Sequence, residues 1–147
     1  MPKKIIISKL GGPNVLKYIS YNIKDKIDDH NVRIKHTSIG LNYIDTYHRN
    51  GIYPLPGKLP ICPGLEAAGI IVDIGSKVKN FKIGDNICYA SPPLGAYCEI
   101  RDMPESKIIN IPSKITNDIA SSIFLKGLTV EYLFQRLYKI KKNQTIL

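Results

Sequence analysis

Residues 39–53 decide the fold, and they read Ile39-Gly40-Leu41-Asn42-Tyr43-Ile44-Asp45-Thr46-Tyr47-His48-Arg49-Asn50-Gly51-Ile52-Tyr53. An alternating run that contains Val32, Ile34 and Ile39 leads into this stretch and breaks at Gly40. Polar groups then appear beside aromatic rings. A strand that ends in such a cluster brings hydrogen-bonding side chains to the rim of a sheet or barrel, where ligand sites commonly lie. We therefore expect a ligand site at the end of a strand over residues 31–41.

The composition predicts a folded, water-soluble domain. The chain has 147 residues, of which 44% are hydrophobic and 22% charged, so disorder is not expected. No apolar run approaches the ~18–20 residues of a membrane span. The residues after Met1 provide only a short apolar run and no small-residue cleavage site. We therefore expect no membrane association, no signal peptide and a cytoplasmic location.

The net charge of +9 raises the question of nucleic-acid binding. The lysines are spread along the chain, however, and the only dense run is Lys139, Lys141 and Lys142. Arginine, which reads bases and phosphates better than lysine, is scarce. A solvated basic surface is therefore expected, and a nucleic-acid-binding barrel is the rival hypothesis.

The cysteines and histidines do not form a recognisable metal or disulfide pattern. Cys62, Cys88 and Cys98 are odd in number and have no C-x-x-C spacing, which favours ordinary semi-buried thiols. The histidines are scattered, and surface or core roles are expected for all three: His30, His36 and His48.

The first half of the chain predicts three strands and one short helix. The strands are expected over residues 4–9, 15–23 and 31–41. The third alternates most regularly, but the pattern does not decide which of its faces points inward. Asn42 to Asn50 is expected to be a short helix with Asn42 as N-cap. Residues 51–63 are rich in Gly and Pro and predict a loop that lines a site.

The second half predicts more short strands and then two helices. Strands are expected in the second half of residues 64–74, after a turn within residues 81–89, over residues 95–101 and over residues 107–111, and their spacing is typical of a barrel or sandwich. Helices are expected over residues 115–125 and 127–138, with Thr116 or Asn117 as the first N-cap. Residues 143–147 look like the start of another strand, so the chain looks cut rather than finished.

Several short motifs occur together and in order: Gly11-Gly12-Pro13, residues 39–47, Gly51-Ile52-Tyr53-Pro54, Pro63-Gly64-Leu65-Glu66-Ala67-Ala68-Gly69, Gly84-Asp85, Leu94-Gly95-Ala96-Tyr97 and Phe124-Leu125-Lys126-Gly127-Leu128-Thr129. This ordered set resembles the N-terminal part of the NADPH:quinone oxidoreductases. That family is the zinc-free, zeta-crystallin-like branch of the medium-chain dehydrogenase/reductase superfamily. The resemblance extends over nearly all of the chain.

The resemblance implies a mainly β fold with some α structure. Residues 1–112 would form a GroES-like β-barrel, as in the N-terminal domain of alcohol dehydrogenases. Residues 113–147 would supply helices and a first strand that lead into a missing Rossmann domain. No G-x-G-x-x-G phosphate-binding loop occurs in the chain, so NADPH binding is expected to need the missing half.

The metal-free character can be argued from two positions. Zinc-dependent relatives place a Cys shortly after the third strand and a His directly before a Glu. Here the Asn42–Asp45 region has no Cys, and Leu65 precedes Glu66. Catalytic zinc needs three protein ligands, which these positions do not provide. We therefore expect no metal, and we expect Glu66 to be a structural, internally paired carboxylate.

The resemblance also implies roles for the residues of the site. The catalytic residues would be Asn42, Asp45 and Tyr53. The cofactor-binding residues would be Tyr43, Ile44, Asp45, Thr46, Tyr47, Lys126 and Thr129. The chemistry would be hydride transfer from NADPH to a quinone or another small conjugated carbonyl compound. Each residue also has a structural interpretation: Asn42 as a helix cap, the tyrosines as core or rim aromatics, Lys126 as a solvated lysine.

Two alternatives to a quinone reductase stay open. The chain could be a GroES-like binding or interaction module without reductase activity, or its enzyme could reduce enoyl or alkenal substrates. The chain alone is expected to have little activity. Its expected partners are a separately encoded Rossmann polypeptide and, in the full-length family, further copies in a homo-oligomer.

Overall fold

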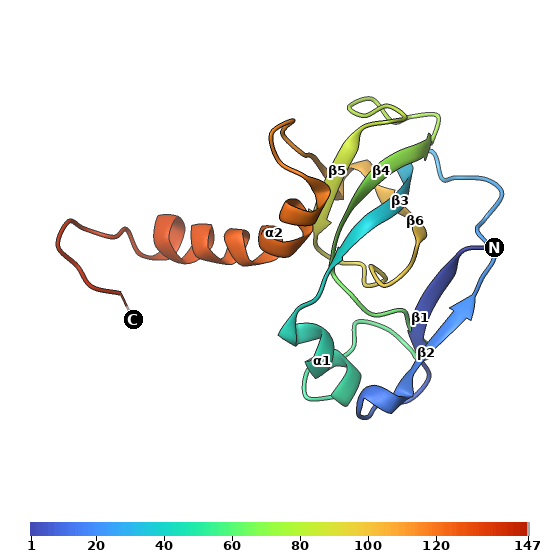
Figure 1. Cartoon of the computed structure of the whole chain (residues 1–147), viewed down its shortest axis with the longest axis horizontal. Coiled ribbons are helices and arrows are strands. Elements are labelled where there is room, and N and C mark those ends of the chain that lie inside the picture. Colours follow the sequence, from blue (N-terminus) through green and yellow to red (C-terminus); the bar gives the residue numbers. More distant parts are fainter. Residues whose placement is uncertain (147) are drawn as a thin grey trace.

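The computed structural model describes residues 1–146 of the chain and has a β-rich body from which a helix extends to one side (Figure 1). The strands are β1 (Lys3–Ile7), β2 (Leu16–Ser20), β3 (Asn31–Gly40), β4 (Glu66–Ile74), β5 (Asn86–Ala90), β6 (Ile100–Pro104) and β7 (Ile109–Asn110). The helices are α1 (Tyr43–Asn50) and α2 (Asn117–Glu131), and the short helical turns are η1 (Pro13–Val15), η2 (Glu105–Lys107) and the π-helical η3 (Tyr132–Leu137).

The strands form two antiparallel sheets. β1 and β2 make a hairpin, and the other strands form a five-stranded sheet in the order β6-β3-β4-β5-β7. The open edge of β1 is held by single bridges, from Ile7 to Ile61 and from Lys4 to Cys98. The mainly β class predicted from the spacing of short strands is therefore confirmed.

The burial of alternate residues in β3 shows which face of this strand points into the core, a question that the sequence pattern left open. Val32 and Ile34 are fully buried, whereas the intervening Arg33 is partly exposed. They pack with Ile71, Ile87 and other apolar side chains in the main core. The inward face of β3 is therefore the one that carries Val32 and Ile34. A register shift between His36 and Ser38 interrupts the alternation, and Ser38 bonds Ser121 of α2.

The opposite face of the sheet carries the base of α2. In β5, Ile87 and Tyr89 point into the main core, and Cys88 between them joins a second cluster with Ala68 and Ala120. α2 packs against β3, β4 and β5. The first turns of α2 thus cover the sheet next to the end of β3.

The short helix predicted after β3 is present as α1. Asn42 is its N-cap in an extended conformation, as predicted. The backbone N–H of Asn42 donates to the carboxylate of Asp45 at 3.0 Å, which gives a capping box. Gly51 ends the helix in the left-handed region, with φ of 80°.

The two predicted C-terminal helices form one continuous helical segment. Thr116 caps α2 by accepting from the N–H of Ile119, as expected. The prediction of a break at Gly127 is wrong, because glycine ends a helix by adopting positive φ and Gly127 does not. α2 instead continues to Glu131 and passes into η3, where Arg136 pairs with Glu131.

Two predicted strands differ from the structure. The strand expected over residues 95–101 begins only at Ile100, because the N–H groups of Gly95 and Ala96 donate to Gly64 rather than to a sheet neighbour. The strand expected over residues 143–147 is absent from residues 143–146, and Leu147 lies outside the described residues. These C-terminal residues lie away from the sheet (Figure 1).

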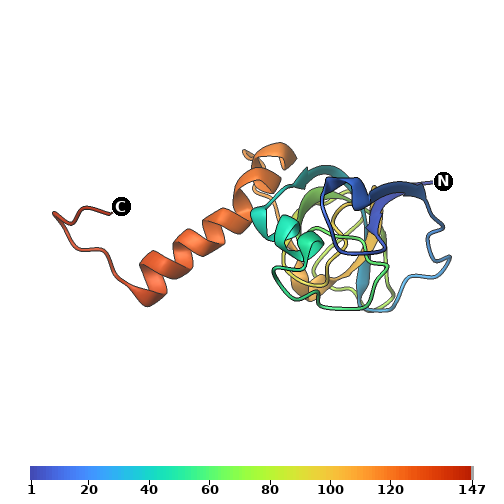
Figure 2. The same cartoon turned by 90° about the horizontal axis from the view of Figure 1, so that it is seen from below.

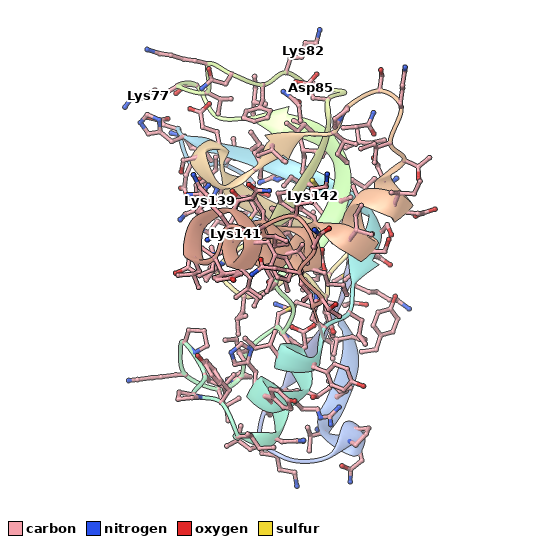
Figure 3. All side chains as sticks on the ribbon, turned by 90° about the vertical axis from the view of Figure 1, so that its left-hand side faces the viewer. Lys77, Lys82, Asp85, Lys139, Lys141 and Lys142 are labelled. Atoms are coloured by element: carbon pink, nitrogen blue, oxygen red, sulfur yellow. The ribbon has the colours of Figure 1, made fainter. Side chains whose placement is uncertain are left out.

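The lysines do not gather on one face. Lys139, Lys141 and Lys142 lie on the segment beyond η3, whereas Lys77 and Lys82 lie on a distant loop of the body (Figure 3). Lys77 is paired with Asp29 at 2.9 Å. Within residues 1–146, no helix is both long enough and apolar enough to cross a membrane.

The substitution Gly69→Ala is expected to destabilise the fold by about 1–3 kcal/mol, since overpacking has this cost. A Cβ at Gly69 would meet the backbone of Lys35 and the Cα of His36 at 2.9 Å, on the neighbouring strand. Urea unfolding followed by circular dichroism measures the change in free energy of unfolding.

The matched control is Gly127→Ala, whose Cβ meets nothing within 4 Å. Because alanine favours a helix interior over glycine, this variant should be more stable by about 0.5–1 kcal/mol. Equal stability of the two variants would contradict the packing assigned to β3 and β4.

Candidate active site

A groove of about 720 Å³ lies between the start of α1 and the middle of α2. Its walls are formed by Leu41, Asn42, Tyr43, Ile44, Thr46, Leu125, Lys126 and Thr129. In Figure 2 the start of α1 lies beside α2, although the two segments are far apart in the sequence. The groove therefore depends on contacts that hold the end of β3 against α2.

Those contacts centre on the carboxylate of Glu66, which is fully buried at the start of β4. Glu66 Oε2 accepts from the side-chain amide of Asn42 at 2.8 Å, and Oε1 accepts from the backbone N–H of Leu125 at 2.6 Å. The ammonium group of Lys126 lies 3.7 Å from Oε2 and donates to Asn42 Oδ1 at 2.9 Å. This arrangement orients Asn42 and Lys126 at the edge of the groove and bears out the internally paired role expected for Glu66.

Gly40 permits this close approach. A Cβ at position 40 would lie 2.5 Å from Glu66 Oε2 and would also collide with the backbone carbonyl of Ser121 in α2. The absence of a side chain therefore lets β3 reach both the buried carboxylate and the helix. The side chains of Ser38 and Ser121 share a hydrogen bond of 2.6 Å next to this point.

Asp45 does not line the groove but holds Asn42, which does. Its Oδ2 accepts from the backbone N–H of Asn42 and from the hydroxyl of Tyr97 at 2.8 Å, and the side chain is buried. Burial raises the pKa of Asp45, and its hydrogen bonds to Asn42 and Tyr97 act in the opposite direction. Burial likewise raises the pKa of Tyr97, so its hydroxyl stays protonated and can donate. Asp45 thus fixes Asn42 and the start of α1.

The groove walls combine one cation, two hydroxyl groups and an exposed ring. Tyr43 is 83% exposed, and Lys126 is more than half exposed. Thr46 and Thr129 each donate to a carbonyl of their own helix, at 2.7 and 3.0 Å, which leaves their oxygen lone pairs able to accept. Such a wall can contact a polyanionic ligand at one end and a flat ring at the other.

The structure therefore brings together six of the predicted site residues: Asn42, Tyr43, Ile44, Thr46, Lys126 and Thr129. Asp45, Tyr47 and Tyr53 are not among the groove-lining residues. Tyr53 instead packs edge-on against the ring of His48, with centroids 5.7 Å apart. The roles expected for these three residues stay predictions.

Sequence reasoning missed three residues that shape the site: Leu41, Leu125 and Tyr97. Leu41 and Leu125 each stand next to a predicted site residue in the sequence. Their place near the site could therefore be inferred, but no pattern indicated that their side chains line the groove. Tyr97 could have been suspected, because it is the one large polar residue in the motif Leu94-Gly95-Ala96-Tyr97.

The donor set fits part of a dinucleotide and does not fit a metal. Within the described part of the chain, no three His, Cys, Asp or Glu side chains gather in a metal-binding arrangement. Lys126 suits the phosphate oxygens of a nicotinamide cofactor, Thr46 and Thr129 can accept from its ribose hydroxyls, and the exposed ring of Tyr43 suits a flat ring system. The groove thus fits one side of the expected NADPH.

Comparison with known proteins supports the same assignment. Residues 28–113 match the alcohol dehydrogenase GroES-like domain. The chain is 43% identical over 147 residues to the quinone oxidoreductase of Pseudomonas aeruginosa, of which it spans 45%. It is 36% identical over 146 residues to a 2-haloacrylate reductase of Burkholderia, of which it spans 44%.

A solved relative has the same fold. The crystal structure of Escherichia coli quinone oxidoreductase complexed with NADPH superposes with a TM-score of 0.92 and 40% identity, covering 97% of this chain and 43% of that one. The chain thus spans less than half the length of these relatives. The resemblance and fold class expected from the motifs are confirmed: the chain belongs to the alcohol dehydrogenase GroES-like domain family, and its homologues include quinone oxidoreductases of the medium-chain dehydrogenase/reductase superfamily.

Proposed function

We propose that this chain forms the nicotinamide- and substrate-facing wall of a zinc-independent NADPH:quinone oxidoreductase. The observation that supports this most is the groove between α1 and α2, where Asn42 and Lys126 are held by the buried carboxylate of Glu66. The relative crystallised with NADPH, at 40% identity, supports the choice of cofactor.

In this proposal the residues of the groove bind NADPH and orient it. The Lys126 ammonium attracts the negative charge of the cofactor, and the Thr46 and Thr129 oxygens accept from its hydroxyl groups. Asn42 keeps a fixed orientation because both ends of its amide are bonded, to Glu66 and to Lys126. Asp45 acts as a positioning residue through Asn42. NADPH, when bound, supplies the hydride that reduces the acceptor.

The acceptor in this proposal is a quinone, which is flat and largely apolar. Leu41, Ile44 and Tyr43 give the groove apolar and aromatic surface of the kind such a ring requires. Tyr47 and Tyr53 are both partly exposed on or after α1, and we assign them to the acceptor side. A small conjugated carbonyl compound is the second candidate acceptor, favoured by the similarity to a 2-haloacrylate reductase.

The complete site needs a nucleotide-binding partner. No described residue belongs to a Gly-rich phosphate loop, and α2 with η3 exposes a series of apolar side chains: Ile119, Ile123, Leu128, Val130, Tyr132, Leu133 and Leu137. We propose that a Rossmann domain or a separately encoded Rossmann polypeptide covers this surface. The complete enzyme would be a cytoplasmic homo-oligomer.

A chimera tests the function directly. Residues 1–147 would replace the equivalent part of the Escherichia coli enzyme, and NADPH oxidation with 1,4-benzoquinone and with 2-chloroacrylate would be followed at steady state. Quinone turnover is expected, and Lys126→Met should lower kcat/KM by roughly 10- to 150-fold, since one charge-assisted hydrogen bond is worth roughly 1.5–3 kcal/mol.

The matched control for this assay is Lys82→Met, on a loop far from the groove (Figure 3). Its kcat/KM should stay within about twofold of the unsubstituted chimera, because an exposed charge at that distance is screened. Equal losses in both variants, or a chimera that folds but reduces neither acceptor, would count against the proposal.

The chain alone is expected to bind NADPH weakly. The groove supplies one lysine, whereas pyrophosphate binding normally uses the N–H groups at a helix N-terminus. Titration of the purified 147-residue chain, followed by NADPH fluorescence, should show no saturation below about 100 μM, which is a free energy of roughly −5.5 kcal/mol. Saturation at low micromolar concentration would contradict the need for a second wall.

Glu66→Gln is expected to destabilise the chain by about 1–3 kcal/mol. The glutamine amide would turn one acceptor into a donor that faces the donor groups of Asn42 or Leu125. The control Glu131→Gln removes an exposed pair with Arg136 and should change the free energy of unfolding by under about 0.5 kcal/mol. Urea unfolding distinguishes the two, and similar small effects would refute the central role of Glu66.

A further inference from the structure

A second cavity of about 360 Å³ lies on the body, and two cysteines line it. Cys62 and Cys98 share this pocket with Lys4, Tyr21 and Arg101. Both lie along the open edge of β1, since Ile61 bridges to Ile7 and Cys98 bridges to Lys4. Two thiols that are far apart in the sequence are thus held side by side at a pocket open to solvent.

The two sulfur atoms interact with fixed polar groups. The Cys62 thiol donates to the carbonyl oxygen of Tyr97 at 3.4 Å, and the Cys98 thiol donates to the carbonyl oxygen of Gly95 at 3.1 Å. Cys98 Sγ lies 3.9 Å from His36 Nδ1. The imidazole is itself held in place, because Nδ1 bonds the carbonyl of Cys98 at 2.7 Å and Nε2 bonds the hydroxyl of Tyr89 at 2.9 Å.

This environment makes the two thiols unequal. The neighbouring Cys62 thiol, then His36 and Arg101, lower the pKa of Cys98 against the effect of burial. The neighbouring Cys98 sulfur and burial raise the pKa of Cys62. Cys88, on the opposite face of the sheet, has its pKa raised to about 11 by burial and by Glu66. Cys98 is therefore the thiol best able to act as a thiolate, and Cys88 is the inert reference.

We propose that Cys98 and Cys62 form a peroxide-reactive pair that closes to a reversible disulfide. The Cys98 thiolate attacks one oxygen of a hydroperoxide, the O–O bond breaks, and Cys98 becomes a sulfenic acid while hydroxide or alkoxide leaves and takes up a proton. The Cys62 sulfur then attacks the Cys98 sulfur and expels water. The two thiols lose two electrons and the peroxide gains them.

The pocket supplies what each step needs. Lys4 and Arg101 place positive charge beside the thiolate and the departing oxygen. Cys62 lines the same pocket as Cys98, and its Sγ lies 3.4 Å from the carbonyl oxygen of Tyr97, the residue before Cys98, so it is close enough to resolve the sulfenic acid. The reaction is independent of hydride transfer, because the groove between α1 and α2 shares none of these residues.

Thiol counting and peptide mapping on the full 147-residue chain test the proposal. After equimolar hydrogen peroxide, the free thiols measured in denaturant should fall from three to one, with Cys88 left free. Mapping should give a Cys62–Cys98 cross-linked peptide whose mass is lower by two hydrogen atoms, and dithiothreitol should restore all thiols. Cys88→Ser should lose its two thiols at the same rate. Retention of all thiols, or a cross-link that includes Cys88, would overturn the proposal.

Trapping with dimedone separates the roles of the two thiols. In Cys62→Ser the sulfenic acid on Cys98 cannot be resolved, so dimedone should label Cys98. In Cys98→Ser, labelling should fall at least tenfold. Labelling of Cys62 in the second variant without labelling of Cys98 in the first would refute the assignment. If one of these variants does not fold, thiol counting and peptide mapping on the unsubstituted chain and on Cys88→Ser still test whether the disulfide forms.

Discussion

The buried carboxylate of Glu66 is the interaction on which the rest of the site depends. A carboxylate without solvent exposure is unfavourable unless donors surround it. Here the surrounding groups come from two segments: the Asn42 amide donates from the start of α1, and in α2 the Leu125 N–H donates while the Lys126 ammonium lies 3.7 Å away. Each donor satisfies the charge only if its segment is in the right place. The cost of burying the charge therefore specifies the arrangement of β4, α1 and α2.

The same constraint extends outward from Glu66 to the start of α1. Gly40 lets β3 come close enough for Asn42 to reach Glu66, and Asp45 caps the helix through the N–H of Asn42. The second contact of Asp45 is the hydroxyl of Tyr97, the residue before Cys98. Tyr97, which bonds Asp45, is thus the sequence neighbour of Cys98, which lines the cysteine pocket. A change in the covalent state of Cys98 would act next to a residue that supports α1.

The parts of the fold that follow from local patterns could be predicted from the sequence. The alternation in β3 and the capping residue Asn42 depend on neighbours within a few positions, and both agree with the structure. The failures involve distant partners. The N–H groups of residues 95–97 donate to residues 63–64, so a sequence pattern that resembled a strand does not join the sheet there. Likewise, Leu125 and Tyr97 belong to the site only because Glu66 and Asp45 reach them, which no spacing in the chain indicates.

Lys126 marks the boundary between the anchored and the projecting parts of α2. Residues before it pack on the sheet through Ala120 and Phe124, and the N–H of Leu125 is bonded to Glu66. Beyond it, α2 and η3 expose Leu128, Leu133 and Leu137. Isolated helices of this length are marginal in water, so packing has to stabilise the projecting turns. A surface that packs there would also close the groove at Lys126 and Thr129. The stability of the outer helix and the completion of the cofactor site would then come from the same contact.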